Sequence, residues 1–213
     1  MFGPITTRPS DAEERTFIAE LQVGSEEAFN RLIALYATSV YRVAYRLLND
    51  PADASDTAQE VFLRVFRGIG RFQNNCSLKT WIYRITVNAV SNQNRWWHRH
   101  RGHEVSLDLP EDSPMPVSVR NSDRSWDPFE SLLSQETQEL VQKALLRLPE
   151  SARAVLVLRE MEGLSYDEVA EILHVSLGTV KSRLARARLA LKTELETLLA
   201  PAPAPAPVWS PAD

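Results

Sequence analysis

A proline-containing stretch without apolar periodicity divides this chain of 213 residues into two parts. Residues 102–128 include Pro110, Pro114, Pro116 and Pro128, and proline interrupts helices because it lacks the amide N–H that a helix requires. Apolar residues recur at helical spacing on both sides of this stretch. The sequence therefore predicts two small helical domains joined by a flexible linker.

All the elements that we expect are helices, so the predicted fold class is all-α. The first domain (residues 12–101) follows a tail of residues 1–11, and the second domain (residues 129–199) precedes an Ala/Pro tail at residues 200–213. The expected helices cover residues 12–23, 26–48, 51–67, 78–100, 129–147, 150–161, 165–174 and 176–199. The apolar positions expected on the buried face of the second helix are Phe29, Leu32, Ile33, Tyr36, Val40, Val43 and Leu47.

Capping residues mark several of these helix boundaries. Asp50, Ser77 and Ser176 each precede a helical pattern and can accept a hydrogen bond from a free amide of the first turn. Ser165 with Glu168 has the spacing of a capping box. These signals place helix starts within a residue or two.

Charge is distributed unevenly along the chain. The formal net charge is only -4, yet residues 61–103 contain eight Lys or Arg and no Asp or Glu. Residues 172–193 are also free of acids, whereas residues 104–140 hold nine acids against two arginines. Aromatic residues are interleaved with the cations of the first window, and this combination is typical of nucleic-acid binding, where cations contact phosphates and aromatic rings stack on bases. The alternative is an ordinary solvated face.

Other features bear on location and chemistry. No apolar run approaches the roughly 18 residues of a membrane span, and the amino terminus lacks the basic and apolar pattern of a secretory signal. The single cysteine, Cys76, cannot form an intrachain disulfide, as is usual in a reducing compartment. We expect a cytoplasmic protein that makes no membrane contact by itself.

Metal and catalytic sites are not indicated. His98, His100 and His103 with Cys76 match no usual zinc spacing. No glycine-rich phosphate loop is present, and no pattern brings Ser, His and acidic residues together. We expect no cofactor and no enzyme activity.

Residues 165–186 have the spacing of a helix-turn-helix. Val169, Leu173, Val180 and Leu184 would face inward. The second helix would present six residues outward, namely Gly178, Thr179, Lys181, Ser182, Arg183 and Arg186. A helical hairpin without DNA-binding function would bury the same positions, but it would not explain the basic outer face.

At this point two stretches resemble a known family. Residues 53–72 (DASDTAQEVFLRVFRGIGRF) followed by 77–92 (SLKTWIYRITVNAVSN) resemble region two of bacterial RNA polymerase sigma factors of the extracytoplasmic function (ECF) group. Residues 148–188 (LPESARAVLVLREMEGLSYDEVAEILHVSLGTVKSRLARAR) resemble region four of the same group. The ordered pair is specific, whereas either motif alone also occurs elsewhere.

The resemblance implies a protein-binding helix in region two. It assigns contact with the clamp helices of core RNA polymerase to Asp53, Asp56, Gln59, Glu60 and Phe62. Asp53 could equally be an acid at the start of a helix, where the helix dipole favours it. Thr57 occupies a position where the family usually has an aliphatic residue.

The resemblance also implies two DNA contacts. Region two would bind and melt the minus-ten promoter element, receiving a flipped base between the loop at 72–77 and the following helix. The residues assigned to this element are Phe72, Asn74, Asn75, Lys79, Asn88, Asn92, Arg95 and Trp96, and Trp81 is expected in the core. The loop at 73–76 departs from the family pattern, so its preferred base is open. The outer residues of the helix-turn-helix would bind the minus-thirty-five element.

The function implied is transcription initiation with core RNA polymerase, promoter DNA and an anti-sigma factor as partners. A stand-alone helix-turn-helix regulator of duplex DNA is the main alternative, and an interaction protein that binds polymerase without DNA is a third. A linker of roughly 26 residues can extend to about 85 Å, which exceeds two turns of duplex, about 70 Å. Its acids (Glu104, Asp108, Glu111 and Asp112) would either mimic RNA near the polymerase active centre or merely solvate a tether.

Overall fold

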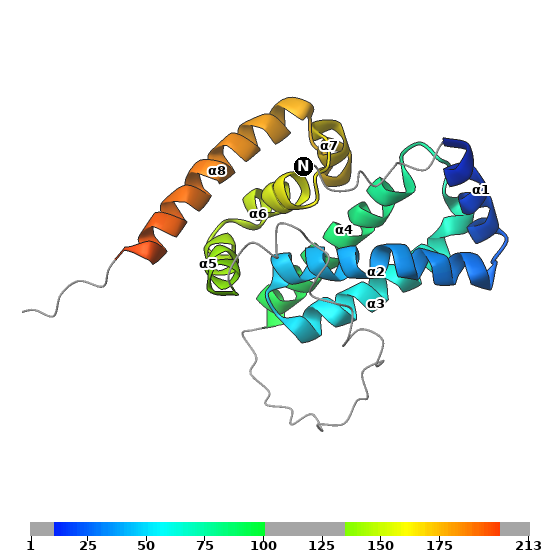
Figure 1. Ribbon diagram of the computed structural model, residues 1–213, viewed down its shortest axis with the longest axis horizontal. Coiled ribbons are helices and arrows are strands. Elements are labelled where there is room, and N and C mark those ends of the chain that lie inside the picture. The colour runs from blue at the N-terminus through cyan, green and yellow to red at the C-terminus, as the bar shows by residue number, and fades with distance from the viewer. Residues whose placement is uncertain (1–10, 101–134, 201–213) are drawn as a thin grey trace, which may run out of the picture.

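The structure is a computed structural model that describes residues 11–100 and 135–200. All of the regular elements in these two ranges are helical, and no strand occurs in them (Figure 1). The predicted linker, residues 1–10 and 201–213 of the two tails, and residues 129–134 of the predicted helix at 129–147 lie outside the described residues. The all-α prediction is confirmed for the part of the chain that the structure describes.

The first region contains four α-helices. They are α1 (Asp11–Gln22), α2 (Glu26–Leu48), α3 (Pro51–Gly68) and α4 (Leu78–His100), with a 3-10 turn, η1 (Ile69–Arg71), after α3. Asn49 ends α2 in the left-handed conformation with φ 63°, and the Asp50 carboxylate accepts a hydrogen bond from the Asp53 amide at 2.9 Å. The break between α2 and α3 therefore arises from local chemistry, as the sequence predicts.

Helices α2, α3 and α4 pack together and form the core of this region. Leu32, Val40, Val43 and Leu47 of α2 are buried as expected. Ile33, which we also expected on the buried face, is 45% exposed. The buried stripe of α2 is therefore narrower than its apolar pattern, because no described helix covers Ile33.

Helix α1 fixes the segment that leads into α4. The Glu14 carboxylate accepts a hydrogen bond from the Leu78 amide at 2.8 Å, and the Gln22 amide group donates to the carbonyls of Ile69 (3.2 Å) and Phe72 (3.0 Å). Ser77 accepts from the Thr80 amide at 3.1 Å, so the predicted cap is present. Together these bonds hold both ends of the loop at 72–77.

The second region also consists of helices. They are α5 (Gln135–Leu146), α6 (Glu150–Leu156), a π-helical turn labelled η3 (Val157–Met161), α7 (Tyr166–Leu173) and α8 (Leu177–Leu199). The predicted capping box is present, because the Ser165 amide donates to Glu168 at 2.7 Å and the Glu168 amide donates to Ser165 Oγ at 3.2 Å. The predicted helix at 150–161 thus changes from α to π geometry part of the way along.

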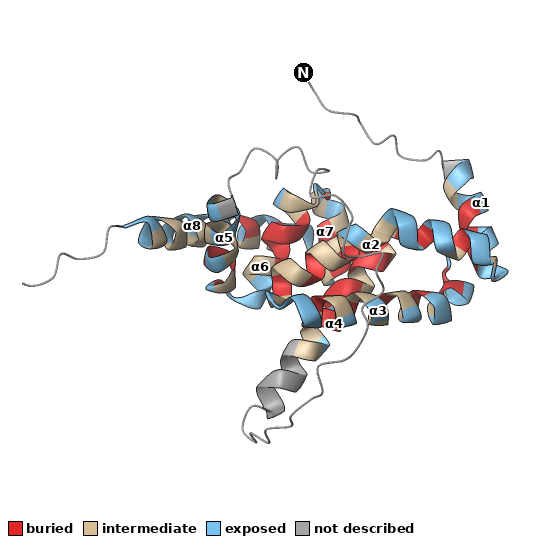
Figure 2. Cartoon of the chain, turned by 60° about the horizontal axis from the view of Figure 1, so that its bottom comes forward, coloured by how far each residue is buried: buried red, intermediate tan, exposed pale blue. Residues whose placement is uncertain are grey.

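The two regions pack against each other. Helix α7 lies on α4, and η3, α5 and α6 contact α2, so the buried residues of both regions form one continuous apolar cluster (Figure 2). The sequence contains no signal for this contact. No helix in the described ranges is long and apolar enough to cross a membrane.

Candidate nucleic-acid and protein-binding surfaces

The outer side of α3 presents most of the residues assigned to polymerase contact. Asp56 and Gln59 are exposed, and Glu60 is partly exposed and pairs with Arg64 one turn later at 2.8 Å. Phe62 is half-buried and packs against the core. The helix therefore presents polar residues to solvent beside a partly accessible aromatic ring.

Carboxylates gather at the start of α3. Burial raises the pKa of Asp53, the neighbouring charges of Asp50 and Asp56 raise it further, and a hydrogen bond with Gln93 lowers it. Asp50 caps the helix, whereas Asp53 lies in its first turn, where the helix dipole favours an acid. This end of α3 is negatively charged and suits a cationic partner.

Thr57 is buried where an aliphatic residue is usual. Its hydroxyl donates a hydrogen bond to the side-chain oxygen of Gln93 on α4, which satisfies the buried polar group. A hollow lies beside this contact, lined by Asp56, Thr57, Glu60 and Arg64 of α3 and by Ala89, Asn92 and Gln93 of α4. The α3 surface and the outer face of α4 are therefore adjacent.

An exposed apolar patch, which was not among the residues expected at the site, continues the α3 surface. Phe66 is 61% exposed and its ring lies 4.9 Å from that of Phe29 on α2. Leu63 and Ile33 are exposed nearby on the same two helices, at 48% and 45%. Soluble proteins rarely expose several large apolar side chains together, and such groups mark protein-binding surfaces. The pattern signal was present, since Phe66 follows Phe62 by one helical turn.

Phe72 does not present its ring to solvent. It is only 7% exposed, and its ring lies 4.9 Å from that of Trp81 at an interplanar angle of 36°. A ring must be accessible to stack on a base, so Phe72 is not placed for stacking in this structure. It packs against Trp81 and supports the loop instead. Trp81 packs against the core, as expected. Asn74 and Asn75 are exposed at the tip of the loop, with Asn74 in the left-handed conformation.

Helix α4 has two distinct faces. Asn88 and Asn92 are exposed one turn apart, whereas Tyr83 and Val87 are buried. Lys79 is half-buried, and its Nζ lies 5.6 Å from the centre of the Tyr83 ring. Arg95 and Trp96 lie on α4, but their side chains are outside the described part of the chain. The two asparagines and the tip of the loop thus remain accessible for an unpaired base.

The helix-turn-helix has the geometry that the sequence predicts. Val169, Val180 and Leu184 are buried and Leu173 is half-buried. His174 turns the chain in the left-handed conformation, and Ser176 Oγ then accepts from the Thr179 amide at 3.1 Å. The second helix, α8, begins immediately after this cap.

The assigned residues of α8 lie on its outer side. Gly178, Lys181, Ser182 and Arg186 are exposed, and Thr179 and Arg183 are half-buried. Hydrogen bonds within the helix orient several of them, because Ser182 Oγ donates to the Thr179 carbonyl at 3.1 Å and Arg186 Nε donates to the Ser182 carbonyl at 3.2 Å. The cations Lys181 and Arg186 are thus exposed in the amino-terminal half of α8, the part of a recognition helix that contacts the major groove.

Comparison with known proteins identifies the class. The family model described as Sigma-70 region 2 matches residues 32–100, and the model described as Sigma-70, region 4 matches residues 138–191. The chain is 32% identical over 187 residues to the RNA polymerase sigma-H factor of Pseudomonas aeruginosa, covering 88% of this chain and 96% of that relative. It is 30% identical over 181 residues to the ECF RNA polymerase sigma factor SigW of Bacillus subtilis, covering 85% and 96%. The chain belongs to the ECF group of RNA polymerase sigma factors.

Solved structures share the fold. CnrH in complex with the cytosolic domain of CnrY superposes with a TM-score of 0.63 at 21% identity, covering 86% of this chain and 97% of that one. The sigma factor RpoE in complex with the anti-sigma factor NepR from Bartonella quintana gives a TM-score of 0.61 at 24% identity, covering 79% and 96%. At these identities the likeness concerns the fold alone.

Proposed function

We propose that this chain binds core RNA polymerase in the cytoplasm, directs it to specific promoters and melts the minus-ten element. The observation that carries the proposal is that sigma region two and sigma region four occur in order on one chain. A stand-alone regulator of duplex DNA would need only the second of these. RNA synthesis itself belongs to the polymerase, so we assign this chain no catalytic residue.

Polymerase docks on α3 in this proposal. Asp53, Asp56, Gln59, Glu60 and Phe62 supply the polar and aromatic contacts assigned by resemblance. The exposed patch around Phe66 extends that surface, because apolar anchors beside charged residues are the usual composition of a binding interface.

Promoter melting takes place between the loop and α4. An unpaired base enters beside Asn74 and Asn75 and meets Asn88, whose amide both donates and accepts hydrogen bonds. Flipping a base costs a few kcal/mol, and stacking with hydrogen bonding to its exposed edge offsets that cost. The DNA backbone around this base is contacted by Lys79, Asn92, Arg95 and Trp96. Phe72 holds the loop in place.

The outer face of α8 binds the minus-thirty-five element in the major groove. Lys181 and Arg186 contact base edges, while Gly178, Thr179, Ser182 and Arg183 allow close approach and bind phosphates. An anti-sigma factor is the remaining partner that we propose. RpoE was solved in complex with the anti-sigma factor NepR and CnrH in complex with the cytosolic domain of CnrY, and these likenesses motivate the assignment.

One experiment separates the candidate functions. Purified core polymerase is incubated with the protein, captured, and then supplied with a promoter selected from a random library. We expect co-capture and transcription that depends on the added protein. Duplex binding without co-capture would favour the stand-alone regulator, and co-capture without transcription would favour the interaction protein.

A matched pair of variants tests the docking surface. Asp56→Ala removes an exposed acid from the first turns of α3, and Asp167→Ala removes an exposed acid from the first turn of α7. We expect only Asp56→Ala to weaken co-capture. Equal retention by both variants would contradict the assignment of α3.

A further inference from the structure

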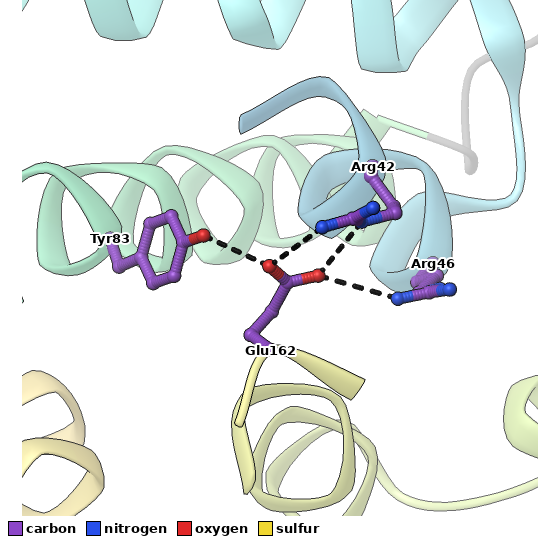
Figure 3. A network of polar contacts seen from close by, with 4 residues as sticks. All are labelled: Arg42, Arg46, Tyr83 and Glu162. Carbon is purple, nitrogen blue, oxygen red and sulfur yellow. Dashed lines mark hydrogen bonds and ion pairs between the residues drawn. The ribbon is translucent and has the colours of Figure 1, made fainter. Parts of the chain in front are cut away.

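Glu162 connects the two regions through a buried polar network (Figure 3). Its carboxylate accepts hydrogen bonds from Arg42 Nε at 3.0 Å, from Arg42 Nη2 at 3.2 Å and from Arg46 Nη1 at 3.3 Å. The Tyr83 hydroxyl donates to the same carboxylate at 2.9 Å. Glu162 belongs to the second region, whereas Arg42 and Arg46 lie on α2 and Tyr83 on α4. One acid therefore joins three side chains of the first region.

The chain directs Glu162 toward α2 and α4 by unusual local geometry. The π-helical turn η3 ends at Met161 and Gly163 adopts a left-handed φ of 67°, so the residue between them projects away from its own helix. Its side chain is only 3% exposed. A buried carboxylate is strongly unfavourable unless cations and hydrogen-bond donors surround it. Arg42, Arg46 and Tyr83 supply these partners to Glu162 while the two regions are packed together, and separation of the regions would remove them. π-helical turns often occur at functional sites.

Besides the shared apolar cluster, the contact between the regions includes further polar contacts. Glu150 accepts from the Ser91 hydroxyl, Arg153 donates to the Leu47 carbonyl, and Gln142 donates to the carbonyls of Tyr45 and Arg46 at 3.4 Å. Arg84 lies 4.0 Å from Glu171. Contacts between domains commonly combine apolar and polar groups in this way, and domains joined by such contacts can move relative to each other.

The packed arrangement limits how far apart the two DNA-binding helices can be. Asn88 follows Arg84 on α4 by four residues, about 6 Å of helix, and Arg84 contacts Glu171 on α7. Lys181 follows Glu171 by ten residues, which span at most about 35 Å even when fully extended. Asn88 and Lys181 therefore lie closer together than two turns of duplex, about 70 Å.

We propose that Glu162, Arg42, Arg46 and Tyr83 form a latch that keeps the free protein closed. In the closed state region four cannot reach its promoter element while region two occupies the other. The outer side of α3 stays exposed, so polymerase docks first and the latch opens afterwards. The regulatory part of this inference rests on the proposed function, whereas the closed state itself does not.

Distance measurement tests the latch in the free protein. Spin labels are placed on cysteines introduced by Arg71→Cys and Asp167→Cys, one exposed position in each region, in a Cys76→Ser background. We expect a short, narrow distance distribution in the otherwise unaltered chain. Glu162→Gln should increase the population at long distances about tenfold.

A neighbouring acid provides the control. Glu160 pairs with Arg188 at 2.6 Å, and both residues belong to the second region. Glu160→Gln should leave the distances unchanged. Tyr83→Phe keeps the buried ring and removes one hydrogen bond, so it should open the protein less than Glu162→Gln does. Circular dichroism shows whether Glu162→Gln folds. If it does not fold, Tyr83→Phe still tests the latch.

Polymerase binding tests the regulatory part. The opened variants should form a complex with core polymerase and a promoter bearing both elements about tenfold more readily, with unchanged binding to a fragment that carries the minus-ten element alone. Unchanged distances in both Glu162→Gln and Tyr83→Phe would overturn the latch. Altered distances with an unchanged preference between the two promoters would overturn its regulatory role. If the unaltered chain does not bind polymerase at all, the proposed function fails while the distances still decide the latch.

Discussion

Gly163 is the residue on which the turn into α7 depends. Its φ of 67° is strained for any residue with a Cβ, yet no atom lies within 4 Å of a Cβ built there. Gly163→Ala should therefore lower the free energy of unfolding by about 1 kcal/mol through backbone strain alone. Gly70→Ala is the control, because Gly70 has equal space and no positive φ. Urea denaturation measures both, and an equal effect of the two substitutions would contradict the strain argument.

Asn88 is exposed on α4, so its proposed role concerns DNA rather than packing. Asn88→Ala should leave polymerase binding and the melting temperature unchanged and should reduce opening of a duplex promoter. The loss should be smaller on a template already mismatched across the minus-ten element, because the unpairing cost is then absent. Permanganate footprinting on both templates measures this difference. A lower melting temperature with equal loss on both templates would indicate a packing role.

Ionisation of the Tyr36 hydroxyl makes the free energy of unfolding depend on pH in the alkaline range. Burial, with a smaller effect of Glu14, raises its pKa from 10.0 to about 12. The unfolded chain therefore loses this proton first, so the contribution to stability is complete below about pH 10 and is lost as the pH rises to about 12. Tyr36→Phe should reduce that loss by on the order of 2 kcal/mol. Unfolding curves of both proteins at pH 9 and pH 11.5 measure the loss of stability between the two pH values. An equal loss in the unaltered chain and in Tyr36→Phe would contradict the prediction.

At the scale of elements, α8 separates the residues that bind DNA most clearly from those that hold the fold together. Its buried side, with Val180, Leu184 and Ala187, holds it against the second region, while Lys181 and Arg186 stay exposed. Each alanine substitution of these two cations should cost about 1 to 3 kcal/mol in binding to a specific duplex if the side chain contacts a base edge. Fluorescence anisotropy with specific and random duplexes at two salt concentrations measures this. Equal weakening on both duplexes would reduce the role to phosphate contact.

Helix α4 illustrates how one element serves two purposes. Because its side chains repeat every 3.6 residues, Asn88 and Asn92 point outward while Tyr83 takes part in the latch. A change of tilt or rotation in α4 would therefore affect both the DNA face and the contact with region four.

At the scale of the whole molecule, the continuous apolar cluster links the stabilities of the two regions. The free protein should unfold in one cooperative transition, because loss of either region exposes buried surface of the other. Hydrogen exchange of α3 and α8 through a urea titration should show the same midpoint. Glu162→Gln should divide this into two transitions, and two midpoints in the unaltered chain would contradict the coupling.

The sequence by itself determined that the described elements are helices, where the capped helices begin, and the surface of the helix-turn-helix. These features depend on interactions within a few residues, such as the Asp50 and Ser77 caps and the capping box of Ser165 with Glu168. A helix that must bury Val180 and Leu184 necessarily exposes Lys181 and Ser182. Family motifs then supplied the class of protein.

Only the tertiary structure decided which side chains are covered by distant elements. Phe72 is buried because Trp81 packs against it, whereas Ile33 and Phe66 are exposed because no described helix covers them. The latch joins Arg42 and Arg46 to Glu162, more than a hundred residues away in the chain. No local pattern encodes such a pairing, since it depends on how two separately formed helical regions meet.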